Sequence, residues 1–232
     1  MQNESNVVDR RSTLSPAKQA LLKKRVRGET VGRRTTPRLV EAPDQRYEPF
    51  PLTDMVEAQW MGRANAYDLG SQAARVYAEF FDSEVNLEDF GRLWRRLVER
   101  HEMLRGIVRA DGQYQILEHV PPYEIAVDDL RALDPGERQA RLMATRQRMA
   151  RHMTPCEVWP LWEVRASLID NKTTRLHMCC DLLVSDIKSF QVIGLEIAKL
   201  YKNPDAPLYP EKFDVSYRDY VIALDTYKQT DS

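Results

Sequence analysis

Helical and strand-like patterns alternate along the chain from Tyr47 onward, and this alternation restricts the possible folds more than any other feature. The clearest helix spans Leu87 to Arg100, where apolar side chains recur every three or four residues and form one stripe. Further helices are expected from Thr53 to about Arg63, from Pro135 to Met153, from Asp186 to Tyr201 and near Tyr217–Lys228. Strands are expected around Ala73–Phe81, Leu104–Arg109, Tyr114–His119, Leu161–Ile169 and Thr174–Val184. The pattern predicts an α/β sandwich with a mixed sheet.

Residues 1–46 differ from residues 47–232 in charge and pattern, and we expect them to form a separate docking or linker segment. They hold eleven Lys and Arg against five Asp and Glu, a net charge of +6, whereas the rest of the chain carries −7. Leu14, Ala17, Leu21 and Leu22 recur at helical spacing and predict one short helix. Such a basic arm could bind nucleic acid, a membrane or an acidic protein, or it could be a solvated linker.

Composition places residues 47–232 among globular domains and indicates a cytoplasmic protein. Hydrophobic residues make up 43% of the chain and charged residues 30%. No apolar run approaches the roughly 18–20 residues that span a bilayer, and the amino terminus lacks the apolar core of a secretory signal. Cys156, Cys179 and Cys180 are an odd number without a disulfide framework, which suits a reducing compartment.

Three segments, in order, resemble motifs of one enzyme family. Residues 50–63 read FPLTDMVEAQWMGR and are similar to FPLTxxQxAYxxGR, residues 100–105 match RHxMLR, and residues 181–186 match DxxxxD. The segment SYRDYV at 216–221 is a further similarity. Together they resemble the heterocyclization branch of the condensation domains of nonribosomal peptide synthetases. The resemblance covers residues 47–232, and the joint order of the motifs is more specific than any one of them.

The DxxxxD segment separates this branch from ordinary condensation domains, which resemble the chain but carry HHxxxDG at the same place. With the terminal aspartate aligned on Asp186, their two histidines fall on Asp181 and Leu182. A leucine side chain can neither accept nor donate a proton. Amide condensation through that histidine is therefore excluded, and so is a free acyltransferase of the same superfamily that depends on it.

The resemblance implies one lobe of a fold like that of chloramphenicol acetyltransferase, with the reaction centre at the junction with a carboxy-terminal lobe. It implies condensation of a carrier-bound acyl or peptidyl thioester with carrier-bound Cys, Ser or Thr, followed by cyclodehydration to a thiazoline or oxazoline. The implied partners are upstream and downstream carrier proteins, which bring the 4′-phosphopantetheine, while the domain itself binds no cofactor. One lobe alone lacks a second wall, so we expect little or no turnover from it.

Asp181 and Asp186 are the candidate catalytic residues. Asp181 ends a predicted apolar strand and Asp186 begins the next helix, where a carboxylate is stabilised by free amide groups. The chemistry needs a proton acceptor during attack and a donor as water leaves, and Asp186 is the first candidate and Asp181 the second. The alternative is that Asp186 is only a helix cap and Asp181 only a structural hydrogen-bond acceptor.

Other polar residues in the motifs have simpler expected roles. We expect His101 to be a satisfied core histidine, Arg105 to form a buried ion pair, and Arg63 to meet the free carbonyls of a helix end. Val56 and Gln59 depart from the family's Gln and Tyr, which puts the tunnel lining and substrate choice in doubt. The histidines and cysteines share no ligand spacing, so no zinc site is expected.

A non-catalytic docking or interaction module is the main alternative function. The basic segment 1–46 favours it, as a site for the acidic tail of the preceding synthase subunit. Binding of nucleic acid is the weakest alternative, because the segment interleaves almost no aromatic residues with its Arg and Lys.

Overall fold

A computed structural model describes residues 38–63, 73–82 and 85–230 of the chain. The chain divides after Arg38, and Leu39–Ser232 forms one compact unit, so the division falls eight residues before the expected boundary at residue 46. The helix expected around residues 14–22 and most of the expected linker lie outside the described residues. Among the residues described, no helix is long and apolar enough to cross a bilayer.

The helix with the strongest periodicity forms where it was expected. Helix α4 (Leu87–Arg100) begins at Asn86, whose side chain accepts hydrogen bonds from the amides of Glu88 and Asp89. Its apolar stripe is buried, and Leu97 is fully inaccessible. The members of the stripe that are buried are Phe90, Leu93, Trp94, Leu97 and Val98.

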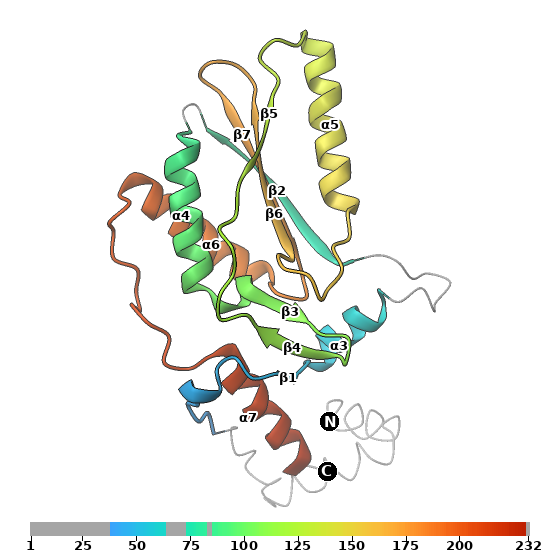
Figure 1. Ribbon diagram of the computed structural model, residues 1–232, viewed down its shortest axis with the longest axis vertical. Coiled ribbons are helices and arrows are strands. Elements are labelled where there is room, and N and C mark those ends of the chain that lie inside the picture. Colours follow the sequence, from blue (N-terminus) through green and yellow to red (C-terminus); the bar gives the residue numbers. More distant parts are fainter. Residues whose placement is uncertain (1–37, 64–72, 83–84, 231–232) are drawn as a thin grey trace, which may run out of the picture. The chain divides into compact units, whose positions relative to one another are not determined.

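A four-stranded sheet in the order β2-β7-β6-β5 carries most of the core (Figure 1). Its strands are β2 (Arg75–Asp82), β7 (Thr174–Asp181), β6 (Trp162–Leu168) and β5 (Ala126–Asp129). The short strand β5 pairs parallel with β6 and the other pairs are antiparallel, so the expected mixed sheet is confirmed. Strand β5 was not predicted, because four residues reading AVDD carry almost no strand signal.

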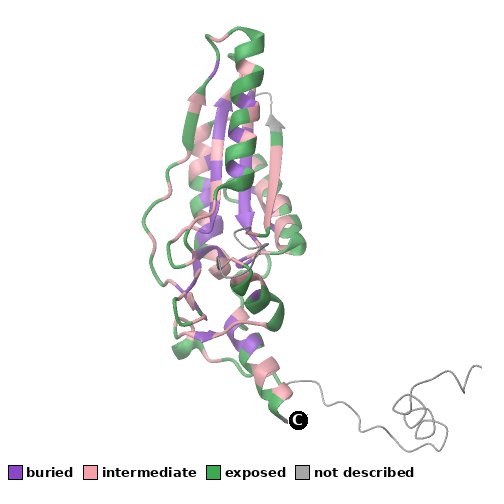
Figure 2. Ribbon diagram, turned by 90° about the vertical axis from the view of Figure 1, so that its right-hand side faces the viewer, coloured by how far each residue is buried: buried purple, intermediate pink, exposed green. Residues whose placement is uncertain are grey.

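Helices cover both faces of this sheet. Figure 1 shows α5 (Pro135–Arg151) on one side and α4 with α6 (Ile187–Lys202) on the other. Strand β7 alternates accordingly: Leu176, Met178 and Cys180 belong to the apolar core, whereas His177 and Cys179 lie on the other face. The buried residues concentrate in the central strands (Figure 2).

A second, three-stranded antiparallel sheet in the order β1-β4-β3 adjoins the first. It consists of β1 (Phe50–Pro51), β4 (Gln113–Ile116) and β3 (Gly106–Val108), and α7 (Tyr217–Thr230) runs beside β1. The strand expected from Leu104 begins only at Gly106, because residues 102–105 form the 3₁₀ turn η2 (Glu102–Arg105). The turn from β3 to β4 needs Gly112, whose φ is 75° and whose missing side chain leaves room for the ring of Trp60.

Two short helices complete the described unit. Helix α3 (Asp54–Met61) follows β1 and confirms the helix expected after Thr53, and the 3₁₀ helix η1 (Pro43–Gln45) precedes it. Arg46, just beyond η1, forms an ion pair of 2.6 Å with Glu102. The last residues of the expected amino-terminal segment therefore contact the main unit.

Candidate active site

The candidate site is the loop from Asp181 to Asp186, which joins the end of β7 to the start of α6. Asp181 is the last residue of β7, and its side chain is almost fully buried, with 3% of the residue exposed. One carboxylate oxygen, Oδ1, accepts a hydrogen bond of 3.0 Å from the amide of Leu183. The other, Oδ2, lies 2.9 Å from Nη1 of Arg63. The carboxylate therefore holds the first turn of its own loop and an arginine 118 residues earlier in the chain.

Arg63 does not cap the end of its own helix, so that expectation was wrong. Helix α3 ends at Met61, and the guanidinium of Arg63 instead pairs with Asp181 and donates to the carbonyl of Thr154 at 2.9 Å. The side chains of both ion-pair partners are more than nine-tenths buried. Burying two charges is costly, and the pair persists because further hydrogen bonds satisfy each partner.

A second cation lies near the same carboxylate. Arg75 opens β2, and its Cα is paired with that of Asp181 across the sheet. Burial raises the pKa of Asp181 above its ordinary value, while the Leu183 amide, Arg63 and Arg75 act in the opposite direction and limit the rise.

Asp186 is the N-cap of α6, as one of the two interpretations expected. Its Oδ1 accepts from the amide and the hydroxyl of Ser189, both at 2.7 Å, and the Ser189 hydroxyl accepts from the amide of Asp186 at 3.3 Å. These hydrogen bonds lower the pKa of Asp186. The residue is exposed to solvent. The two candidate carboxyl groups thus have pKa values displaced in opposite directions, one buried and one open.

A tyrosine that the sequence did not single out as a site residue binds the loop, and a second tyrosine packs against the first. Tyr114 of β4 is buried and donates a short hydrogen bond to the carbonyl of Leu183. Its ring stacks on Phe50 with centroids 5.2 Å apart and meets Tyr217 edge-on at 6.0 Å. Tyr217 lies in the SYRDYV segment, so a motif signal existed for it. For Tyr114 the sequence contained only the alternation of apolar and polar residues in its strand, which does not indicate a site residue.

The two departures from the first motif do not place polar groups in an open site. Val56 is 8% exposed and belongs to the apolar core. Gln59 is half-buried, and its Oε1 has no hydrogen-bond partner within the described part of the chain. Val56, which stands where the family has Gln, therefore contributes to the packing of the core.

His101 and Arg105 of the second motif are structural. Nε2 of His101 lies 2.6 Å from a carboxylate oxygen of Glu196, which also binds Arg100, so the expected satisfied histidine is confirmed, at the edge of the core. The ion pair expected for Arg105 is absent from the described contacts. Its buried guanidinium instead donates to the backbone carbonyls of Leu117, Val98 and Glu99.

Beyond the candidate loop, the described residues include side chains of metal-ligating types, thiols and a cavity. Within the described ranges, no three His, Cys, Asp or Glu side chains could jointly hold a metal ion. Cys179 and Cys180 face opposite sides of the sheet, toward the carbonyl of Met149 and toward Ser185 respectively. A cavity of about 860 Å³ is lined by Arg46, Arg100 and Phe213 among others, and not by Asp181 or Asp186.

Comparisons with known proteins give a consistent family. A family model described as the condensation domain matches residues 50–232. Bacitracin synthase 1 of Bacillus licheniformis is 32% identical over 188 residues, covering 81% of this chain and 4% of that protein. Phenyloxazoline synthase MbtB of Mycobacterium tuberculosis is 30% identical over 207 residues, covering 84% of this chain and 14% of that protein.

Solved structures agree with these sequence matches. The EpoB NRPS cyclization-docking bidomain from Sorangium cellulosum has a TM-score of 0.79 and 32% identity, over 94% of this chain and 43% of that chain. The chain therefore spans less than half the length of each of these relatives. The expected fold, one lobe of the condensation-domain type, is confirmed.

Proposed function

The chain belongs to the condensation-domain family, and from this premise we propose that it is the amino-terminal lobe of a heterocyclization domain in a nonribosomal peptide synthetase. The observation that carries the proposal is the loop after β7, where Asp181 and Leu182 stand at the positions of the paired histidines of ordinary condensation domains. The similarity to a phenyloxazoline synthase and to a cyclization bidomain supports the same branch.

The proposed reaction has two stages. The amine of a Cys, Ser or Thr thioester on the downstream carrier attacks the acyl or peptidyl thioester of the upstream carrier. An amide forms, the carbon–sulfur bond breaks, and the upstream arm leaves as a thiol. The acceptor's side-chain thiol or hydroxyl then attacks the new amide carbonyl. The former carbonyl oxygen takes up the proton of the attacking group and becomes a hydroxyl. This hydroxyl leaves as water together with the proton of the amide nitrogen, and the carbon–nitrogen double bond of a thiazoline or oxazoline forms. The 4′-phosphopantetheine arms belong to the two carriers, and the lobe contributes no cofactor.

Asp186 and Asp181 have different proposed parts in this chemistry. Asp186 is exposed and, as a carboxylate, is the first candidate for the proton acceptor; the hydrogen bonds from Ser189 that lower its pKa also make it a weaker base than a free aspartate. Asp181 is the second candidate for a group close to the reacting atoms, as a carboxylate paired with Arg63 whose pKa burial raises above the ordinary value. Its pairing with Arg63 also orients the loop, so a positioning role through Arg63 is part of the proposal.

A carboxy-terminal lobe would supply the second wall of the tunnel. Both carboxyl groups lie at one end of a single sheet, and one wall cannot expel water from two thioester-bound substrates or hold them in attack geometry. We therefore expect this chain alone to give little or no heterocycle.

The test is to load both carriers, add the chain alone or with the carboxy-terminal lobe of the same synthase, and measure the product on the downstream carrier by mass spectrometry. The expected result is condensation followed by loss of one water only when both lobes are present. Amide formation without loss of water would contradict heterocyclization. Full turnover by the chain alone would contradict the one-lobe assignment.

Residues 1–46 have a separate proposed function, as a docking segment for the acidic tail of the preceding synthase subunit. Their net charge of +6 supports this, and the solved relative is itself a cyclization-docking bidomain. Titrating a synthetic acidic tail peptide against the chain with and without residues 1–46 tests it. Equal affinity for both forms would show that the peptide does not bind to residues 1–46.

The thiols of Cys156, Cys179 and Cys180 form no disulfide bonds, which supports a cytoplasmic setting for the assembly.

A further inference from the structure

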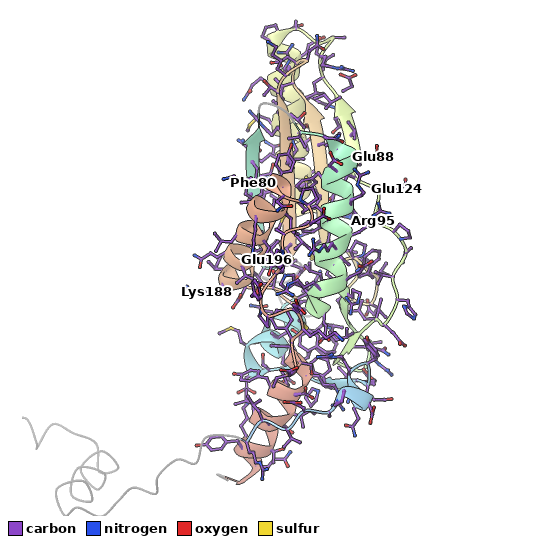
Figure 3. All side chains as sticks on the ribbon, turned by 90° about the vertical axis from the view of Figure 1, so that its left-hand side faces the viewer. Phe80, Glu88, Arg95, Glu124, Lys188 and Glu196 are labelled. Carbon is purple, nitrogen blue, oxygen red and sulfur yellow. The ribbon has the colours of Figure 1, made fainter. Side chains whose placement is uncertain are left out.

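Helix α6 has two chemically different sides. Its inner side buries Ile193 and Leu200 in the core. Glu196, its only acidic residue, lies between α6 and α4 and binds Arg100 and His101 (Figure 3). The carboxylate of Glu196 therefore binds side chains of the same domain and adds no negative charge to the outer surface of the helix.

The outer side of α6 is apolar and cationic. Leu195 is 73% exposed, Ile187 59% and Val192 47%, a large apolar exposure for one surface helix. At 100° per residue, the exposed positions occupy one continuous arc of the helix. We call this surface the α6 outer face, and its members are Ile187, Lys188, Gln191, Val192, Leu195, Ala198, Lys199 and Lys202. It contains three lysines and no Asp or Glu.

The α6 outer face begins at the candidate site. Ile187 directly follows the cap residue Asp186, and the 16 residues of the helix extend about 24 Å from there. Figure 3 shows Lys188 on the same side as Phe80 of β2, an apolar side chain that is also 44% exposed. A protein bound along this face would therefore lie next to the loop that carries Asp181 and Asp186.

We propose that the α6 outer face docks a carrier protein through an acidic helix that carries apolar side chains. The inference rests on the proposed function, which requires carriers to deliver their arms to this loop. Leu195, Val192 and Ile187 supply the apolar contact, and the lysines supply complementary charge that speeds association and sets orientation. An anionic membrane is the less favoured occupant, because three lysines and no tryptophan on the face are few anchors for a lipid surface.

The test measures affinity for the phosphopantetheinylated carrier protein of the same synthase, labelled with fluorescein, by anisotropy. The variant pair Leu195→Glu and Lys188→Glu takes the net charge of the α6 outer face from +3 to zero and removes its most exposed apolar residue. The matched control is Val127→Glu with Arg141→Glu, an exposed apolar residue of β5 and an exposed cation of α5. Both pairs alter exposed side chains, and circular dichroism checks that both variants fold.

The expected result is a loss of affinity of about tenfold or more for the α6 pair and less than about twofold for the control. Wild-type affinity that survives the α6 substitutions would overturn this inference and leave the proposed function standing. Failure of the wild-type chain to bind the carrier at all would overturn both. Binding to vesicles of anionic phospholipid that the α6 pair abolishes, without a change in carrier affinity, would replace the carrier by a membrane.

Discussion

The carboxylate of Asp181 and the guanidinium of Arg63 form a buried ion pair of 2.9 Å that joins the end of β7 to the residue after α3. Removing one charge from such a pair leaves the other buried and unpaired, at a cost of about 3–5 kcal/mol. We expect Asp181→Asn to lower the free energy of unfolding by that amount, measured by urea denaturation.

The matched control for that ion pair is Glu88→Gln. Glu88 pairs with Arg92 on the surface of α4, where its side chain is 82% exposed. Solvent-exposed pairs contribute about 0–1 kcal/mol, so the control should be close to wild type. Equal effects of the two substitutions would show that Asp181 is not held in a buried pair.

Asp186 allows its capping role to be separated from a chemical one. Asn caps a helix about as well as Asp but cannot accept a proton, whereas Ala removes a cap worth about 0.5–2 kcal/mol. We expect Asp186→Asn to retain stability and to abolish heterocycle formation by the assembled two-lobe domain. Asp186→Ala should lose both. Wild-type turnover by the Asn variant would reduce Asp186 to a cap.

The same residue predicts a dependence of stability on pH. Because its pKa is lower in the folded chain than in the unfolded chain, its contribution is present above the ordinary pKa of an aspartate, about 3.9. The contribution is lost as the pH falls through the folded value. Unfolding measured between neutral and strongly acidic pH should be less pH-dependent in Asp186→Asn than in wild type.

His177 is a buried neutral histidine under α5. Its Nδ1 lies 2.7 Å from the hydroxyl of Tyr77, which donates to Glu79, and its Nε2 lies 2.9 Å from the hydroxyl of Ser167. This arrangement assigns the ring proton to Nδ1. The ionisable groups facing the ring are Tyr77 and Glu79 of β2, Arg175 of β7, Arg165 of β6, Asp128 of β5 and Arg146 of α5.

Burial lowers the pKa of His177 below its ordinary 6.5. The unfolded chain therefore binds the proton first as the pH falls, and stability decreases from about pH 6.5 toward the folded value. We expect His177→Gln to reduce this slope in chemical denaturation between pH 8 and pH 5, a range set by the ordinary pKa of about 6.5. The matched control is His119→Gln, which removes an exposed histidine, and an equal reduction of the slope by both variants would contradict the assignment to His177.

Arg105 tests whether three backbone carbonyls need a planar guanidinium. Lysine keeps the charge but cannot reach the carbonyls of Leu117, Val98 and Glu99 from one fixed fork. Arg105→Lys should therefore lower the free energy of unfolding by about 2 kcal/mol or more, since buried carbonyls lose their donors. Arg95→Lys, at an exposed position of α4, should change it by less than about 0.5 kcal/mol. A tolerated lysine at 105 would show that these carbonyls do not need a planar guanidinium.

Helix α4, the alternation of β7 and the cap at Asp186 could all be predicted from the sequence. Each depends on side chains that lie within a few residues of one another in the chain. Apolar residues repeat about every 3.6 residues in a helix and every two residues in a strand, and Asp is preferred directly before a helix, so these local patterns can be read without coordinates. The order of the motifs likewise identified the family, because the spacing of residues along the chain survives without coordinates.

The contacts that hold the candidate site were decided only by the tertiary structure. Arg63 reaches Asp181, Tyr114 reaches Leu183, and Arg105 finds three carbonyls where an ion pair was expected. Strand β5 forms because β6 offers it a parallel edge. The physical reason is that a partner distant along the chain leaves no periodic signal near the residue it binds, so packing alone selects it.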